Sequence, residues 1–66
     1  MNRLELRVEI TRKELSNRFI AQELGISEQA FYTKMNGSRE FKESEIKKLI
    51  QLLDLSPDRV NEIFLV

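Results

Sequence analysis

Hydrophobic residues recur at helical spacing through most of this chain and divide it into short segments. The clearest pair lies within SNRFIAQELGISEQAFYTKMNG, residues 16 to 37, where segments 17–24 and 28–35 flank Gly25. Each segment spaces its apolar residues mostly three or four positions apart, which predicts one buried face per helix. The residues predicted to face the core from this pair are Phe19, Ile20, Leu24, Ala30, Phe31 and Met35, with Ala21 beside them.

Residues that typically begin helices precede several segments. Ser16 and Ser27 stand directly before the central pair, and a serine hydroxyl there accepts a hydrogen bond from the first turn. Ser56-Pro57-Asp58 predicts another start, with proline at the first helical position and an acid in the first turn. Apolar spacing predicts one more helix at about residues 44–53.

The N-terminal segment RLELRVEIT, residues 3–11, is open to two interpretations. Its apolar residues alternate with polar ones, which is the period of a strand. Leucine, glutamate and arginine favour helix, and the only candidate partner strand is the ending 63–66. We expect a helix and keep a two-stranded pairing of the chain ends as the alternative. The predicted fold is all-α, a single domain over residues 1–66 with about five short helices and a central helix-turn-helix.

A sharp corner joins the two central helices. Ala21 is small where the second helix must cross the first, and Gly25 permits the left-handed backbone of a tight turn. Such a unit can hold its second helix away from the body and lay it in the major groove of DNA. The outward residues of that helix carry short or planar hydrogen-bonding groups suited to base edges, and they are Ser27, Glu28, Gln29, Tyr32 and Thr33.

Residues 16 to 37 resemble the helix-turn-helix of phage Cro and repressor proteins, the Cro/C1-type family, whose members have the lambda-repressor-like fold. Ala21, Gly25 and Phe31 stand at the fixed offsets of that family, and Ser27 and Asn36-Gly37 stand where it often has them. The similarity continues outside the motif at Leu6-Arg7, Ile10, Phe41, Glu45-Ile46, Leu53, Leu55 and Ile63-Phe64. The resemblance therefore covers most of the chain.

Two positions depart from the pattern of that family. Asn17-Arg18 stands where a Gln or Glu is usual, and Asn17 is shorter than either. Leu15 stands where a Gly is common. The first two helices could therefore be joined differently from those of the family, or run together.

The resemblance implies a role for each outward residue. Gln29 lies where the family reads bases, and its amide can pair with adenine through two hydrogen bonds, while Glu28 could accept from cytosine. Tyr32 and Thr33 lie one turn further on and can touch a thymine methyl or a base edge. Asn17 lies where the family touches phosphate. The candidate phosphate contacts are Asn17, Arg18, Lys34, Asn36, Ser38, Arg39 and Lys42.

Most of these residues also have a purely structural explanation. Ser27 is a predicted cap. Glu28 and Lys34 complement the helix dipole in its first and last turns. Tyr32 could be a half-buried packing residue. Gln29 is the residue that neither capping nor packing requires.

Composition and charge limit the other function classes. The chain has 11 basic and 11 acidic residues, whereas nucleic-acid binding usually needs a basic footprint. It has no Cys and no His, which excludes thiol nucleophiles and the usual zinc sites. We expect no catalysis, cofactor, metal or small-molecule ligand. No apolar run approaches the roughly 20 residues of a membrane span, and the N-terminus lacks a signal pattern, so we expect a soluble cytoplasmic protein.

The predicted function is a sequence-specific double-stranded DNA-binding transcription regulator, a Cro-like phage or prophage repressor that occupies an operator as a homodimer. An end at Val66 without a second domain favours that role over a full-length lysogeny repressor. Small size and apolar residues without a place in the core predict a dimer interface at Leu4, Val8, Phe64, Leu65 and Val66. The alternative is a protein-binding module on the same scaffold, an antirepressor or antitoxin-like partner, which the zero net charge favours.

Overall fold

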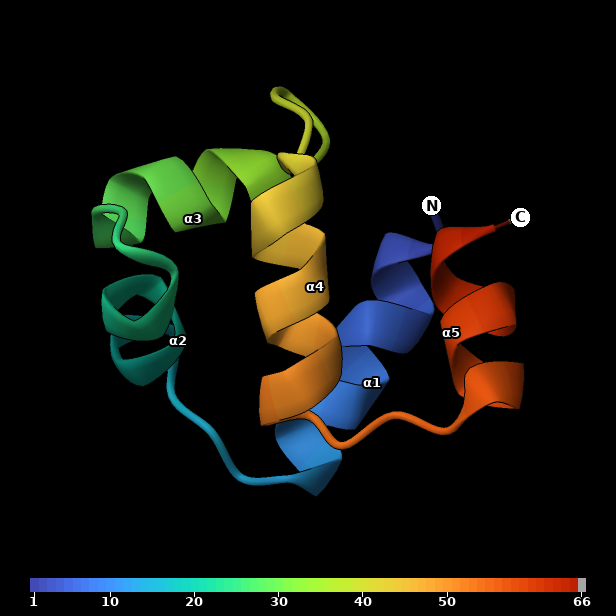
Figure 1. Ribbon diagram of the computed structural model, residues 1–66. Helices are drawn as coiled ribbons and strands as arrows, with labels where there is room; N and C mark the ends of the chain where they lie inside the picture. Colours follow the sequence, from blue (N-terminus) through green and yellow to red (C-terminus); the bar gives the residue numbers. More distant parts are fainter. Residues whose placement is uncertain (66) are drawn as a thin grey trace.

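Five α-helices form the secondary structure of residues 1–65, the part of the chain that the computed structural model describes (Figure 1). They are α1 (Arg3–Arg12), α2 (Asn17–Leu24), α3 (Glu28–Met35), α4 (Glu43–Leu52) and α5 (Pro57–Phe64). No strand occurs among these 65 residues, so the all-α class is confirmed and the strand alternative for residues 3–11 is wrong. No helix in the described range is long and apolar enough to cross a membrane.

Side-chain caps explain why the helix boundaries follow so directly from the sequence. Ser16, Ser27 and Ser56 each accept a hydrogen bond from the backbone N–H three residues further on, at 3.0, 3.0 and 3.3 Å. Asn2 does the same through Oδ1 at 3.1 Å. Each cap satisfies an N–H group that has no partner within the helix. The bounds of α2 and α3 agree with those predicted, and α4 begins one residue before the expected range.

The helices pack around α4, which runs through the middle of the molecule (Figure 1). α2 packs on both α3 and α4, and α1 packs on α5. The core draws on all five helices and on Phe41 in the loop before α4, whose ring lies 6.1 Å from that of Phe31. The buried core residues are Leu6, Ile10, Ile20, Ala21, Phe31, Met35, Phe41, Leu49, Leu53 and Ile63.

Phe19 was predicted to be buried, and this prediction is wrong, because its side chain is 42% exposed. Ile20 and Ala21, by contrast, are buried. Successive residues of an α-helix are about 100° apart around the axis, so Phe19 lies about 200° from Ala21. It therefore faces away from the side of α2 that packs on α3 and α4.

The two ends of the chain are joined through α1 and α5. The backbone N–H of Asn2 donates to the Ile63 carbonyl at 2.6 Å. Arg59 of α5 contacts the carboxylates of Glu5 and Glu9 of α1, both at 3.0 Å, and Glu62 of its own helix at 2.6 Å. The hydrogen bond with Glu62, followed by that with Glu5, raises the pKa of Arg59 above its ordinary value. This cluster fixes α5 against α1 on the far side of α4 from the helix-turn-helix.

Four helices end through a residue with left-handed backbone geometry. Glu14 (φ +57°), Gly25 (φ +72°), Gly37 (φ +91°) and Asp54 (φ +49°) follow α1, α2, α3 and α4. In each case the next N–H donates to the carbonyl five residues earlier, at 3.2, 3.0, 3.0 and 3.2 Å, which is the Schellman arrangement. α1 and α2 are therefore separate helices, and the position that would suit a glycine is Glu14 rather than its neighbour Leu15.

We expect Glu14→Gly to raise the free energy of unfolding and Gly25→Ala to lower it, each by about 1 kcal/mol or less, because a Cβ is strained in this conformation. A Cβ at Gly25 would meet no atom within 4 Å, so backbone strain alone determines that cost. Urea denaturation of both variants measures the effect. A loss of stability in Glu14→Gly would contradict the explanation.

Candidate nucleic-acid interface

α3 lies at the edge of the molecule, with its outer face turned away from α2 and α4 (Figure 1). Ser27, Glu28, Gln29 and Tyr32 are exposed on it, and Thr33 is half-buried. A shallow hollow of about 300 Å³ brings together Ser27, Gln29, Ala30, Thr33 and Arg39. Three of the five candidate base-reading residues and one candidate phosphate contact thus share one surface, with the methyl group of Ala30 between them.

Hydrogen bonds within α3 determine what its outer groups can offer a ligand. The Thr33 hydroxyl donates to the Ala30 carbonyl at 2.9 Å. Its oxygen can therefore only accept a hydrogen bond from a ligand, and its methyl group is available for an apolar contact. Ser27 Oγ accepts the capping hydrogen bond from Ala30, so its own proton is available. The Gln29 side chain makes no hydrogen bond within residues 1–65, which leaves both the donor and the acceptor of its amide available.

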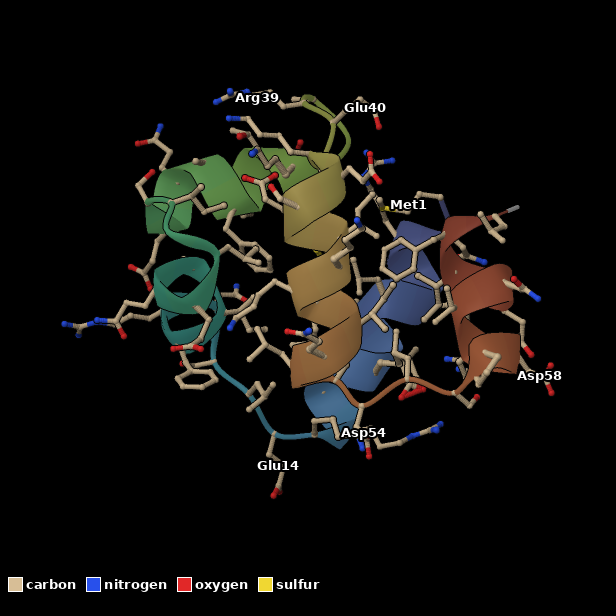
Figure 2. All side chains as sticks on the ribbon, viewed as in Figure 1. Met1, Glu14, Arg39, Glu40, Asp54 and Asp58 are labelled. Carbon is tan, nitrogen blue, oxygen red and sulfur yellow. The ribbon has the colours of Figure 1, made fainter. Side chains whose placement is uncertain are left out.

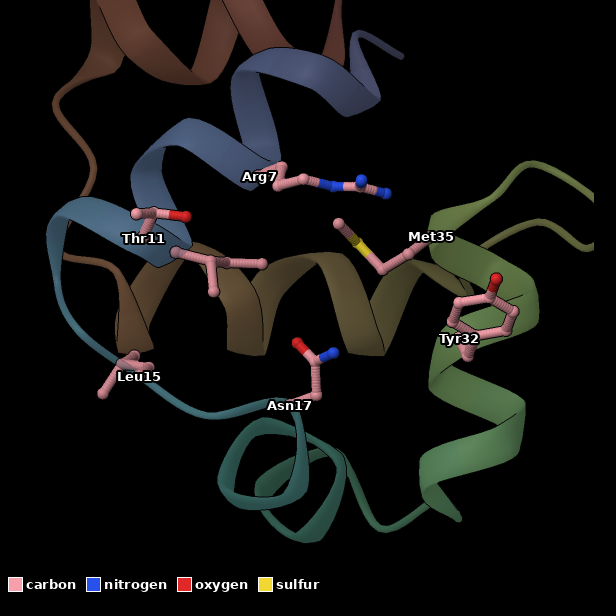
Figure 3. A pocket seen from close by; sticks show the side chains of 7 residues that line it. Arg7, Thr11, Leu15, Asn17, Tyr32 and Met35 are labelled. Atoms are coloured by element: carbon pink, nitrogen blue, oxygen red, sulfur yellow. The ribbon is translucent and has the colours of Figure 1, made fainter.

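Tyr32 belongs to a second hollow, on the other side of α3. This hollow, also about 300 Å³, lies among α1, α2 and α3 and is lined by Arg7, Thr11, Asn17 and Tyr32 together with apolar side chains (Figure 3). Tyr32 is 62% exposed, so the alternative of a half-buried packing residue is wrong. The structure thus places Tyr32 in a different hollow from Ser27, Gln29 and Thr33, in one that it shares with Asn17.

The segment after α3 contains most of the remaining phosphate candidates. Asn36, Ser38, Arg39 and Lys42 are all exposed. Asn36 Oδ1 accepts from the Ser38 N–H at 2.9 Å, so part of that side chain shapes the turn. Arg18, in the first turn of α2, is exposed as well.

Lys34 was predicted to contact phosphate, and the structure contradicts this. Its side chain is 3% exposed and forms an ion pair with Glu45, whose side chain is 6% exposed. Lys34 Nζ donates to both carboxylate oxygens at 2.7 Å, and the Lys42 backbone N–H donates to Glu45 Oε1 at 2.8 Å. The pair joins the last turn of α3 to the first turn of α4 inside the protein, so Lys34 is not available to a ligand.

The position of each charge on its own helix could have indicated this pair. Lys34 lies on the inward face of α3, three residues after Phe31 and next to Met35. Glu45 lies on the inward face of α4, four residues before Leu49. A cation and an anion on the buried faces of successive helices are stable there only when they pair with each other.

The pKa of Glu45 lies below its ordinary value. Burial by itself raises that pKa, but the hydrogen bonds from Lys34 and the Lys42 backbone and the positive charge of Lys34 outweigh it. The carboxylate is therefore charged at neutral pH and holds its two donors in place.

Arg3 holds the C-terminal end of α3 from outside the motif. Its Nε donates to the Lys34 carbonyl at 2.9 Å, and one of its terminal nitrogens lies 3.6 Å from the Glu40 carboxylate. The guanidinium also covers Gly37, where a Cβ would lie 3.7 Å from it. α1 thus stabilises the end of α3 and the turn that follows.

Ion pairing distributes the remaining charge unevenly. Within residues 1–65, six of the 11 basic residues pair with carboxylates. The basic residues left unpaired in this range are Arg7, Lys13, Arg18, Arg39 and Lys42, and the acidic ones are Glu14, Glu28, Asp54 and Asp58. Figure 2 shows Arg39 beside α3 and Glu14 and Asp54 at the opposite end of the molecule. A chain of zero net charge therefore presents three available cations in or directly after the helix-turn-helix, Arg18, Arg39 and Lys42, together with one unpaired acid, Glu28.

A family model described as "Protein of unknown function (DUF739)" matches residues 3–66. The chain belongs to this family. No curated protein and no solved structure matches it. Because the description of DUF739 assigns no activity, the function of this member has to be inferred from the chemistry of its own surface.

The apolar residues assigned to a dimer interface differ in exposure in this DUF739 protein. Leu4 and Leu65 are 71% and 73% exposed, and Val8 is also exposed. Phe64 is half-buried against the core. Val66 lies outside the described residues. The exposed members belong to α1 and to the residue after α5, and α1 and α5 lie across α4 from α2 and α3 (Figure 1).

We expect Glu45→Gln to lower the free energy of unfolding at pH 7 by about 3 kcal/mol, because it leaves Lys34 buried without its counter-charge. Adding Lys34→Met should recover much of the loss, since the uncompensated cation is then gone. Glu43→Gln is the matched control, because Glu43 forms an exposed ion pair with Lys47 and should matter far less. Equal losses in Glu43→Gln and Glu45→Gln by urea denaturation would contradict the role of burial.

The same pair predicts how stability depends on pH. The pKa of Glu45 is lower in the folded protein than in the unfolded chain. The charged carboxylate therefore contributes fully to the free energy of unfolding when the pH is above the unfolded-state pKa. This contribution is lost as the pH falls through the folded-state pKa. The difference in unfolding free energy between wild type and Glu45→Gln should therefore shrink on acidification. Urea denaturation curves of both proteins, recorded from pH 7 to acidic pH, measure this difference in unfolding free energy. A difference that stays constant would show that it does not arise from the charge on Glu45.

Proposed function

We propose that this DUF739 protein is a sequence-specific double-stranded DNA-binding transcription regulator with α3 as its recognition helix. The observation that supports it most is the division of α3 into two faces. The inner face is fixed through Phe31 and the Lys34–Glu45 pair, while the outer one presents hydrogen-bonding groups that the rest of residues 1–65 leaves available. A rigid helix with such a face is what reading base edges in a major groove requires.

Each side chain on the outer face suits a particular contact. Gln29 can pair with adenine, and Glu28 can accept from the amino group of cytosine. Ala30 and the Thr33 methyl group suit the methyl group of thymine. Arg39 and Lys42, unpaired and exposed after α3, suit the phosphates that flank the groove. We infer that affinity comes from this basic border and specificity from α3.

The Cro-like role extends the proposal to a homodimer that occludes a phage or prophage operator. Two recognition helices related by a two-fold axis must lie about 34 Å apart to enter successive major grooves. One protomer measures 29 × 23 × 19 Å, so a separation of that order is within reach of two protomers in contact. The exposed Leu4, Val8 and Leu65 supply apolar surface for the contact.

The second candidate is a protein-binding module, an antirepressor or antitoxin-like partner. The observation that favours it is exposed apolar surface, with Phe19 on α2 in addition to Leu4 and Leu65. Salt dependence separates the two functions. DNA affinity falls steeply with salt because bound phosphates release counterions, whereas an apolar protein interface responds weakly.

Selection from a random duplex library at low salt, with wild type and Gln29→Ala in parallel, tests the proposal. We expect wild type to enrich a palindrome with half-sites about 10 base pairs apart. Gln29→Ala should bind that site about 1–3 kcal/mol more weakly and relax one base position per half-site.

Gln51→Ala is the matched control, because Gln51 is an exposed glutamine near the end of α4 that lies away from α3. Its base preference and affinity should equal those of wild type. No enrichment by folded wild-type protein would overturn the proposed function. Enrichment with an unchanged preference in Gln29→Ala would remove that residue from the reading surface.

A further inference from the structure

The hollow among α1, α2 and α3 is lined by four polar residues and by the apolar Ile10, Leu15 and Met35, and no acidic side chain lines it. Arg7 extends over it from α1, Asn17 points into it from the start of α2, and Tyr32 borders it from α3 (Figure 3). The Thr11 hydroxyl adds a fourth polar group. A guanidinium, an amide, a phenol and a hydroxyl can all donate hydrogen bonds. The polar part of the lining therefore suits an anion.

Arg7 has no carboxylate partner within residues 1–65, although carboxylates occur on both sides of it in the sequence. The nearby arginines Arg3 and Arg12 both pair with glutamates. Glu5 and Glu9 are themselves engaged by Arg59. The acids beside Arg7 in the sequence are thus occupied elsewhere, and its charge remains available over the hollow.

Tyr32 connects this hollow to the base-reading surface. It lies one turn after Glu28 and three residues after Gln29, so its ring stands beside them on the exposed side of α3. A duplex whose base edges meet Gln29 would bring its backbone to the border of the groove, next to Tyr32. The anion most readily delivered to the hollow is therefore a backbone phosphate.

We propose that Arg7, Asn17 and Tyr32 form a composite site for one DNA backbone phosphate in each half-site, with Arg7 as its main cation. The inference rests on the proposed function and adds a phosphate ligand from α1, outside the helix-turn-helix. It also assigns the Tyr32 hydroxyl to phosphate rather than to a base. Because Asn17 is the first residue of α2, the positive end of that helix dipole adds to the attraction.

The test measures the salt dependence of DNA affinity for Arg7→Gln on the selected duplex. Losing one phosphate contact should reduce the slope of log K against log salt by about 0.9 and weaken binding equally on all sequences. Lys13→Gln is the matched control, since Lys13 is an unpaired cation at the end of α1 that does not line the hollow. Its slope should equal that of wild type.

A phosphate-by-phosphate experiment locates the contact. Methylphosphonate substitution removes the charge of one phosphate, and one position per half-site should weaken wild type yet have little further effect on Arg7→Gln. Tyr32→Phe should weaken binding without changing base preference or slope. A relaxed base position in Tyr32→Phe, an unchanged slope in Arg7→Gln, or an equal drop in Lys13→Gln would each overturn the composite site while leaving the proposed function intact. Failure of wild type to bind any duplex would overturn both.

Discussion

The buried Lys34–Glu45 pair is the interaction on which the candidate interface depends. It joins the end of α3 to the start of α4, and both partners are almost fully removed from water. Two further contacts converge on the same joint, from the Lys42 backbone to Glu45 and from Arg3 to the Lys34 carbonyl. Such a pair adds little net stability compared with apolar residues, but it strongly disfavours any arrangement that separates its charges. The cost of separating these two buried charges fixes the orientation of α3, and therefore the direction in which its outer face points.

This joint also explains how a neutral chain can present a basic surface. Acidic residues near the helix-turn-helix are mostly occupied: Glu45 by Lys34, Glu40 by Arg3, and Glu23 by Lys48. Of the cations that remain, Arg39 and Lys42 follow α3 directly, while acids such as Glu14 and Asp54 lie at the opposite end (Figure 2). Charged clefts and surfaces act through their local field, and exposed charges more than about 10 Å away are largely screened at ordinary salt. Net charge is therefore a poor guide to the charge of one surface when the unpaired charges are distributed unevenly over the molecule.

Local chemistry made most of the fold predictable from the sequence. Ser16, Ser27 and Ser56 mark helix starts because a cap depends only on residues within one turn. Gly25 marks the corner for the same reason. Lys34 was misassigned because its inward position on α3 indicates burial only in combination with the inward position of Glu45 on α4, and periodicity within one helix does not combine the two. Phe19 was misplaced because α2 has only 8 residues, too few for its apolar pattern to exclude a neighbouring face. Of the residues predicted to face outward, four are exposed and Thr33 is half-buried. The division of these residues between two hollows could not be predicted, because it requires the packing of α1.

Under the proposed function, the two hollows on either side of α3 would separate two kinds of recognition. One carries Gln29, Ala30 and Thr33, whose groups distinguish bases, and the other carries Arg7 and Asn17, whose groups suit any phosphate. Because the second hollow is built from three helices, its geometry depends on the global packing of the domain rather than on α3 alone. A phosphate contact on that side would set the depth and tilt at which α3 enters a major groove. The positions of the base contacts would then depend on that phosphate contact. In a domain of 66 residues, the same packing that stabilises the fold would in this way also align its reading surface.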